Sequence, residues 1–259
     1  MELFLLIGVL GLVCGFLSGL LGIGGGIIMA PLLLFVPPLF GLEPFTMRTV
    51  AGLTIVQGLV SCLVGAFVHH KHNFVSGRLT VWMGSAIFIA SLLGGVASKY
   101  VANNILLILF GGLAILAAGL ISISIKDDQE SPDVNNLEFS IWRGVSAATG
   151  VGVLGGMVGQ GGSFILIPLM TSFVRIPTRI AVGSNLAIVM LSTGAAFLGK
   201  ALTGQIEWLL AIPIVLTVVP AVTLGGYVSQ KVPVLMLRRL LALFIGLAAI
   251  RIWLSVLPF

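Results

Sequence analysis

Two clusters of glycine in this chain have the composition and setting of an anion-binding site. Residues 22–26 read Gly-Ile-Gly-Gly-Gly, residues 159–163 read Gly-Gln-Gly-Gly-Ser, and a proline follows nine positions after each first glycine. Both clusters lie within long apolar stretches, where glycine breaks a helix and leaves main-chain groups unpaired. Hydrocarbon tolerates such groups only where they line a protein or water-filled cavity, so the pair predicts a transport site within a membrane.

The chemistry expected of these clusters is the binding of negative charge. Half-helices that restart at Ile27 and Phe164 would direct their first N–H groups and positive dipole ends at a ligand. Without a Cβ, the main chain can approach the ligand closely and form an anion-binding concavity. The alternative is tight helix packing, the role expected of Gly94-Gly95 and Gly225-Gly226. The glycines predicted to line the substrate site are Gly24, Gly25, Gly26, Gly161 and Gly162.

Polar side chains that hydrocarbon should exclude accompany the glycine clusters. One lies in the second cluster, one begins the half-helix after it, and three lie a turn or two into later apolar spans. We expect them to hydrogen-bond the oxygens of the anion; the alternative is hydrogen bonding between helices. These residues are Gln160, Ser163, Thr54, Gln57 and Asn185.

Two arginines and one carboxylate lie at the ends of apolar spans. Arg48 and Arg179 precede matching spans, where a guanidinium could attract or gate an oxyanion through paired hydrogen bonds. The alternative for both is anchoring at the membrane interface. Glu207, beside Trp208, is the candidate carboxylate for proton coupling, with interfacial placement as its alternative.

The sequence predicts neither an enzyme nor a metal or cofactor site. Cys14 and Cys62 lie in apolar segments without ligand spacing and are expected to be small packing residues. The run His69-His70-Lys71-His72 has no acidic or cysteine partner nearby, which favours a solvated basic loop over a metal site. No nucleophile and base are paired, no phosphate-binding GxxxxGK[ST] is present, and no basic patch with aromatics suggests nucleic acid.

The elements that must position these residues are membrane-spanning helices. Hydrophobic residues make up 58% of the chain and charged residues 8%, against about a quarter charged in soluble domains. Apolar runs near or above the roughly 20 residues that cross a bilayer accompany two glycine-broken stretches, 3–35 and 141–174. These runs cover residues 49–68, 79–97, 105–125, 180–199, 208–228 and 235–257.

The chain is organised as two repeats. The interval from Gly22 to Gly159 equals the interval from Pro31 to Pro168. A slightly shorter interval separates Arg48 from Arg179. The same shorter interval separates Gly94-Gly95 from Gly225-Gly226, near the end of each half. The polar stretch near the middle is the linker between the repeats. We therefore expect membrane repeats at 1–125 and 141–259, joined by a linker at 126–140.

Basic residues indicate how the repeats face. If each glycine-broken stretch enters the membrane and returns, one side carries nine Lys and Arg residues and the other carries three. This bias predicts an all-α polytopic fold of two inverted repeats, each a glycine-broken hairpin plus three transmembrane helices. The linker is then cytoplasmic and both termini lie outside. The three basic residues on the outer side are Arg48, Lys99 and Lys200.

The two motifs, with Gly52-Leu53-Thr54 and Gly183-Ser184-Asn185 after them, resemble the sulfite exporter TauE/SafE family over essentially the whole chain. Ser163 in place of a third glycine is a departure that could contribute a hydroxyl. The resemblance implies a secondary transporter in the cell membrane for sulfite, thiosulfate or an organosulfonate. We expect alternating access in which one repeat rocks against the other, with a proton or sodium as coupling ion. The alternatives are a passive anion channel and an intramembrane enzyme or assembly factor.

Overall fold

The computed structural model describes residues 2–21, 26–68, 76–122 and 139–229, with residues 243, 246, 250, 251, 253 and 254 beyond them. These residues form helices joined by short connections. The first half contains α1 (Glu2–Leu21), α2 (Gly26–Leu39), α3 (Met47–Val68), α4 (Gly77–Ala97), the 3-10 turn η1 (Ser98–Tyr100) and α5 (Asn103–Ser122). The second contains α6 (Ile141–Val158), α7 (Ser163–Ser172), α8 (Thr178–Leu202) and α9 (Trp208–Ser229).

Six helices of the described part are long and apolar enough to cross a membrane. They correspond to α1, α3, α4, α6, α8 and α9, whereas α2, α5 and α7 give shorter apolar segments within the described ranges. The prediction of an all-α polytopic membrane protein is therefore confirmed. The last apolar run, 235–257, lies largely outside the described residues.

The second glycine cluster interrupts the helices as predicted, whereas most of the first lies outside the described residues. In the first copy α1 ends at Leu21 and α2 begins at Gly26; residues 22–25 lie outside the described ranges. In the second copy α6 ends at Val158, and Gly159, Gly161 and Gly162 adopt positive φ angles of 81°, 59° and 73° before α7 begins. An L side chain rarely adopts this conformation, so the glycines stop α6 and let the chain restart as α7.

The tightest helix contacts join the two halves of the sequence. Stripes of small residues let α1 lie against α9 and α4 against α6. A Cβ at Gly94 would overlap the main chain of Val153, and one at Gly225 would overlap that of Phe16. These glycines are packing residues, as the sequence indicated. The two contacts are also repeat mates, since the shorter repeat interval relates Gly94 to Gly225 and the longer one relates Phe16 to Val153.

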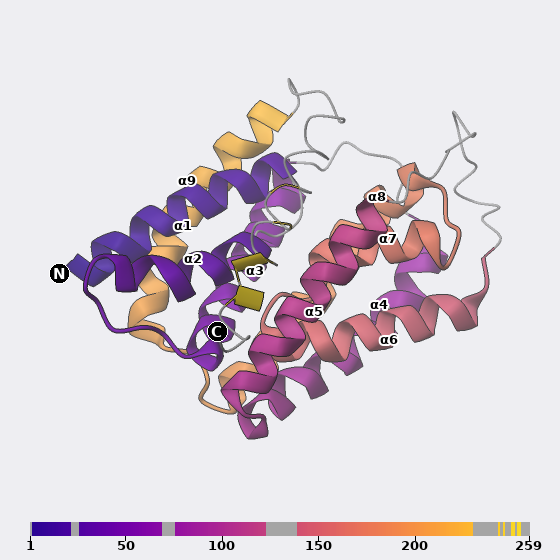
Figure 1. Ribbon diagram of the computed structural model, residues 1–259. Helices are drawn as coiled ribbons and strands as arrows, with labels where there is room; N and C mark the ends of the chain where they lie inside the picture. Colours follow the sequence, from indigo (N-terminus) through magenta and orange to yellow (C-terminus); the bar gives the residue numbers. More distant parts are fainter. Residues whose placement is uncertain are drawn as a thin grey trace.

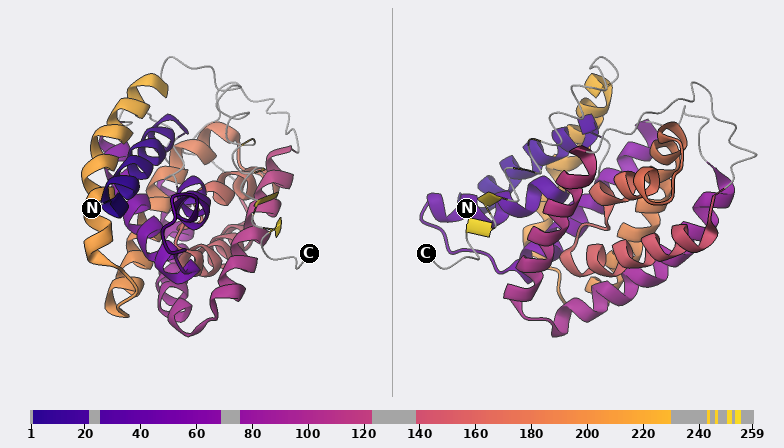
Figure 2. Two further views of the ribbon diagram at one scale, coloured as in Figure 1. Left: turned by 60° about the vertical axis from the view of Figure 1, so that its left-hand side comes forward. Right: turned by 45° about the vertical axis from the view of Figure 1, so that its right-hand side comes forward.

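The helices pack as two lobes, and each lobe takes helices from both halves of the sequence. The first lobe is α1, α2, α3 and α9; the second is α4, α5, α6, α7 and α8. Figure 1 shows the two lobes next to each other, and the turned views of Figure 2 keep α9 alongside α1. Contacts of α3 with α8, α5 and α6 join the lobes. Because α3 carries Thr54 and Gln57, two predicted site residues lie where the lobes meet.

The relative direction of α3 and α8, which occupy matching places in the two repeats, follows from their contacts. Gly52, near the start of α3, faces the main chain of Gln205, just after α8. Further along α3, Leu59 faces Gly194, which lies earlier in α8. The contacts therefore move backwards along α8 as they move forwards along α3, so the two helices run antiparallel.

Candidate anion site at the lobe interface

The start of α2 lies against the second glycine turn. A methyl group added at Gly26 would lie 3.4 Å from Cγ of Gln160 and 3.5 Å from its Cα. Gly26 belongs to the first lobe, and Gln160 lies in the turn between α6 and α7 of the second. The main chain that leaves one glycine cluster therefore meets the other cluster, as a single site shared by both clusters requires.

Hydrogen bonds from neighbouring helices hold the second glycine turn in place. The hydroxyl of Thr54 donates to the carbonyl of Gly159 at 3.0 Å, and that of Ser192 donates to the carbonyl of Gly161 at 2.8 Å. A Cβ at Gly159 would overlap the main chain of Ala51 on α3. The turn is thus clamped between α3 of one lobe and α8 of the other.

The first turn of α7 presents N–H groups at this position. The N–H groups of Ile165 and Leu166 both donate to the carbonyl of Gly162, and that of Ser163 donates to Gln160. No main-chain acceptor within the described ranges is bonded to the N–H of Phe164. Four N–H groups of any helix start lack partners in their own helix and carry partial positive charge, so this end of α7 favours an anion.

Three buried amide side chains, on α3, in the glycine turn and on α8, lack hydrogen-bond partners for at least one atom within the described ranges. Among the described residues, neither the nitrogen nor the oxygen of the Gln160 amide is paired, and the oxygens of Gln57 and Asn185 are also unpaired. All three side chains are nearly inaccessible, at 3%, 0% and 2% exposure. Buried polar groups are almost always paired, so these unpaired amide atoms are candidates for contact with a polar ligand.

The two glutamines have no equivalent in the other repeat. The repeat intervals match Gln57 with Ile188 and Gln160 with Ile23, whereas Thr54 matches Asn185. Each glutamine amide is therefore present at only one of two matching positions in the sequence. Packing alone gives no reason for a buried glutamine where the matching position accepts isoleucine, so this asymmetry favours a binding role.

The remaining predicted residues have other positions or lie outside the description. Ser163 is buried at the start of α7, next to the turn. Gly161 and Gly162 pack on Thr193 and Val151, which shows that they shape the turn. Gly24 and Gly25 lie outside the described residues, as does the side chain of Arg179.

Arg48 does not reach the glycine turn. Its guanidinium donates to the carbonyl of Val101 at 2.9 Å, and its main-chain N–H donates to the side-chain oxygen of Asn103 at 3.3 Å. It is half-buried at the start of α3. This geometry supports the anchoring alternative for Arg48. Glu207 is exposed just before α9, in agreement with interfacial placement.

Three residues that the sequence analysis did not single out for the site support it. Ser61 accepts a hydrogen bond from Gln57 at 3.0 Å, Ser192 holds Gly161, and Lys200 donates to the carbonyl of Met157 at the end of α6. Ser61 and Ser192 are repeat mates, related by the shorter repeat interval. The repeat interval could have identified these serines from the sequence, because Ser61 lies two helical turns after Thr54 and Ser192 lies two helical turns after Asn185.

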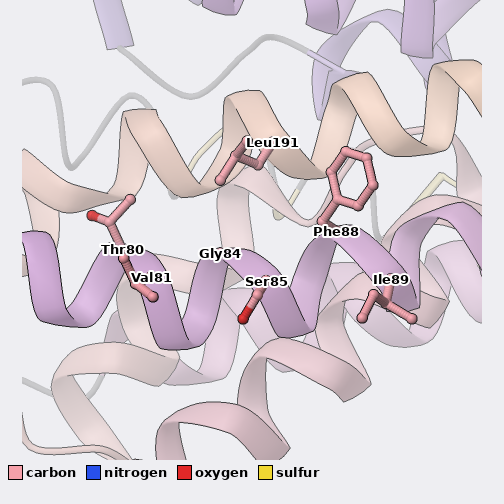
Figure 3. Close-up of a pocket in the computed structure, with 7 residues that line it drawn as sticks. All are labelled: Thr80, Val81, Gly84, Ser85, Phe88, Ile89 and Leu191. Carbon is pink, nitrogen blue, oxygen red and sulfur yellow. The ribbon is translucent and has the colours of Figure 1, made fainter.

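A separate hollow on the surface does not suit a small anion. It has a volume of about 470 Å³ and is lined by residues of α4 and by Leu191 of α8 (Figure 3), and no residue of the glycine turn belongs to its lining. Its walls are almost entirely apolar, and Val81 and Ile89 within it are among the exposed hydrophobic residues. A groove of this composition matches lipid chains on a membrane-facing surface, so it is not the substrate site.

Comparison with known proteins agrees with this architecture. The sequence model described as "Sulfite exporter TauE/SafE" matches residues 7–252. A probable membrane transporter protein of Bacillus subtilis is 27% identical, covering 94% of this chain and 96% of its own. A probable membrane transporter protein of Methanocaldococcus jannaschii is 27% identical, covering 92% of this chain and 91% of its own. One of Haemophilus influenzae is 25% identical, covering 95% of this chain and 96% of its own. No solved structure matches the chain.

Proposed function

Because the chain belongs to the sulfite exporter TauE/SafE family of membrane transporters, we propose that it moves a small sulfur-containing anion across the cell membrane as a secondary transporter. The substrate is sulfite, thiosulfate or an organosulfonate. The anion binds between the lobes, where the start of α2 meets the second glycine turn. The observation that carries this proposal is that the buried amides of Gln57, Gln160 and Asn185 have atoms without a partner among the described residues.

The amides provide the hydrogen-bond donors that sulfur oxyanions need. The nitrogen of Gln160 is unpaired as it stands. Gln57 gains a free donor if its amide is reversed, because the hydroxyl of Ser61 can then donate to its oxygen. The first turn of α7 adds the N–H of Phe164, to which no described main-chain acceptor is bonded, and a positive dipole end. Together these groups suit an oxyanion, whose several oxygens accept hydrogen bonds and whose charge favours the helix start.

The two repeats are inverted in this proposal. The antiparallel course of the repeat mates α3 and α8 supports it, because two repeats facing the same way would place matching helices parallel. We assign residues 1–125 and 141–259 to the repeats and 126–140 to a cytoplasmic linker, with both termini outside. An inverted pair can expose one site to either side of the membrane by two related movements.

The moving units are the lobes. Rocking of one sequence repeat against the other would separate α1 from α9 and α4 from α6, where glycines bring the helices into close main-chain contact. The lobes are joined through fewer contacts, along α3. In this proposal, alternating access therefore occurs by rocking of the lobes about the glycine turns. This movement takes the place of the expected rocking of one repeat against the other.

The test is thermal stabilisation of the detergent-purified protein by sulfite, thiosulfate, taurine, sulfate, phosphate and chloride, because a bound ligand raises apparent stability. We expect a shift with a sulfur oxyanion. Gln160→Met should abolish the shift while the protein stays folded. Thr80→Val is the matched control, since the Thr80 hydroxyl is also unpaired among the described residues but lies in the apolar hollow. Folded protein that responds to none of these anions would contradict the proposal.

Flux measurements in vesicles separate a transporter from a channel. A carrier that closes around its substrate shows saturable uptake that is accelerated by the same anion on the opposite side. Uptake that rises in proportion to concentration and ignores the opposite side would indicate a passive channel on this scaffold.

A further inference from the structure

Lys200 is buried in α8 close to the candidate site. Its side chain is inaccessible, and its nitrogen donates to the hydroxyl of Ser98 at 2.7 Å and to the carbonyl of Met157 at 3.1 Å. Met157 lies two residues before Gly159, the first residue of the second glycine turn. The amino group is therefore attached to the end of α6, the helix that leads directly into the turn.

No negative charge among the described residues balances Lys200. The acidic residues that the structure describes are Glu2, Glu43 and Glu207, and all three are exposed. Both hydrogen-bond acceptors of Lys200 are neutral. Burying an ammonium ion without a counter-charge costs so much that such a group normally loses its proton or acquires a partner. An ionisable group of this kind within a membrane span is typical of a transport function.

Groups on the surrounding elements do not supply a counter-charge either. Arg48 on α3 is close enough for its positive charge to oppose that of Lys200. On η1, Lys99 and Tyr100 are exposed, and Glu207 is exposed before α9. The described charged residues of α4 and α6, Arg78 and Arg143, lie at the starts of those helices, far from the ends that Lys200 approaches.

The hydrogen bonds around Lys200 match a neutral amine. An ammonium group has three N–H donors, whereas an amine has two. Two acceptors are in place within the described part of the chain, one for each hydrogen of the amine. The surroundings of Lys200 thus accommodate the neutral form, and a third N–H has neither an acceptor nor a counter-charge among the described residues.

We propose that Lys200 takes up one proton when the anion binds between the lobes, which makes the protein a proton–anion symporter. This inference rests on the proposed function. The amine accepts a proton from water on the side from which the anion enters and becomes an ammonium ion. After the lobes rock, the anion leaves and the ammonium returns the proton to water on the other side. Each cycle thus moves one proton with each anion.

The experiment measures protons taken up when thiosulfate binds to the purified protein in weak buffer. Thiosulfate keeps its charge near neutral pH, so any proton counted binds to the protein. We expect about one proton per bound anion, and an affinity that falls as the pH rises, because linkage requires deprotonation to oppose binding. Lys200→Met should bind more weakly, without proton uptake and without pH dependence. Lys200→Arg should bind without proton uptake, because a guanidinium keeps its proton.

Two control variants and two outcomes make the result decisive. Lys99→Met removes an exposed lysine next to Ser98 and should behave as the wild type. His69 is the repeat mate of Lys200, related to it by the shorter repeat interval. Because histidine titrates near neutral pH, His69→Gln tests whether this residue takes up the proton instead of Lys200. Thiosulfate binding without proton uptake in the wild type, or unchanged uptake in Lys200→Arg, would overturn the role of Lys200. Absence of binding by any sulfur anion at any pH would instead overturn the proposed function.

Discussion

The interior of this protein holds two polar clusters that differ in what they lack. The turn cluster is Gln160 with Thr54 and Gln57 of α3; its amides have unpaired atoms within the described ranges, and it holds no charge. The end cluster is Ser98, Lys200, Thr203 and Gln205; its hydrogen bonds are paired, but its lysine has no counter-ion among the described residues. Among the described residues, the turn cluster thus lacks hydrogen-bond partners, whereas the end cluster lacks a counter-charge.

The two buried glutamines show this difference most clearly. Gln205 donates to the carbonyl of Gly95 at 2.8 Å and to the hydroxyl of Thr203 at 2.6 Å, and its oxygen accepts from Ser98 at 2.8 Å. Gln160 makes none of the side-chain hydrogen bonds that its amide could make with the described residues. A fully paired amide fixes helices relative to one another, whereas an unpaired one is available to a ligand.

The largest effect is expected from the shape of the glycine turn. Gly159→Ala places a side chain at φ 81° and against the main chain of Ala51. The left-handed conformation costs about 1–2 kcal/mol, and overpacking adds about 1–3 kcal/mol. We expect a clear fall in apparent melting temperature. The matched control is Gly204→Ala, at φ 69° with open space around it, which should lose only the conformational part. Equal losses would show that contact with α3 does not shape the turn.

A smaller effect should distinguish the paired amide from the unpaired one. Gln205→Met leaves the Ser98 hydroxyl and the Gly95 carbonyl with fewer partners in a buried place, which costs about 1–3 kcal/mol. Gln57→Met removes one hydrogen bond, to Ser61, together with a buried oxygen that is already unpaired. We expect the first variant to melt well below the wild type and the second to melt close to it.

Anion binding should show the reverse order for the same two variants. Gln57→Met weakens thiosulfate binding, whereas Gln205→Met leaves the preference among anions unchanged in protein that remains folded. If both variants lose stability equally and neither alters binding, the contrast between the clusters is wrong.

The smallest effect is expected where the lobes meet. Thr54→Val keeps the shape of the side chain but removes the hydrogen bond to the Gly159 carbonyl across the lobe interface. The loss should be about 1 kcal/mol in stability. Thr223→Val, which removes a hydroxyl bonded within α9 on an exposed face, should change the melting temperature little. A loss at Thr54 no larger than at Thr223 would mean that this bond does not hold the lobes together.

Much of the fold could be predicted from local features of the sequence. Long apolar runs must become helices in a membrane because their main-chain groups have no other partners there. Glycine clusters must interrupt those helices, and the structure ends α6 just before Gly159. The role of Gly94-Gly95 and Gly225-Gly226 in packing was also predicted, because small residues are what close helix contact within a membrane requires.

The candidate site was predicted only in part. Gln160 was expected there because a polar side chain in a glycine turn is locally conspicuous. Lys200 was counted only as a basic residue at a span end, since nothing in its neighbours along the chain indicates burial against Ser98 and Met157. Arg48 donates to the carbonyl of Val101, a residue 53 positions away, and nothing in its neighbours along the chain indicates that contact.

The sequence by itself therefore determined the helices and the break before α7, because each depends on residues close together in the chain. The tertiary structure decided which helices form a lobe, that α9 joins α1 rather than α8, and which buried polar groups find partners. Those outcomes depend on contacts between residues more than a hundred positions apart, such as Thr54 with Gly159 and Lys200 with Ser98. Whether a buried amide or amine is paired is a property of such contacts and cannot be read from its immediate neighbours.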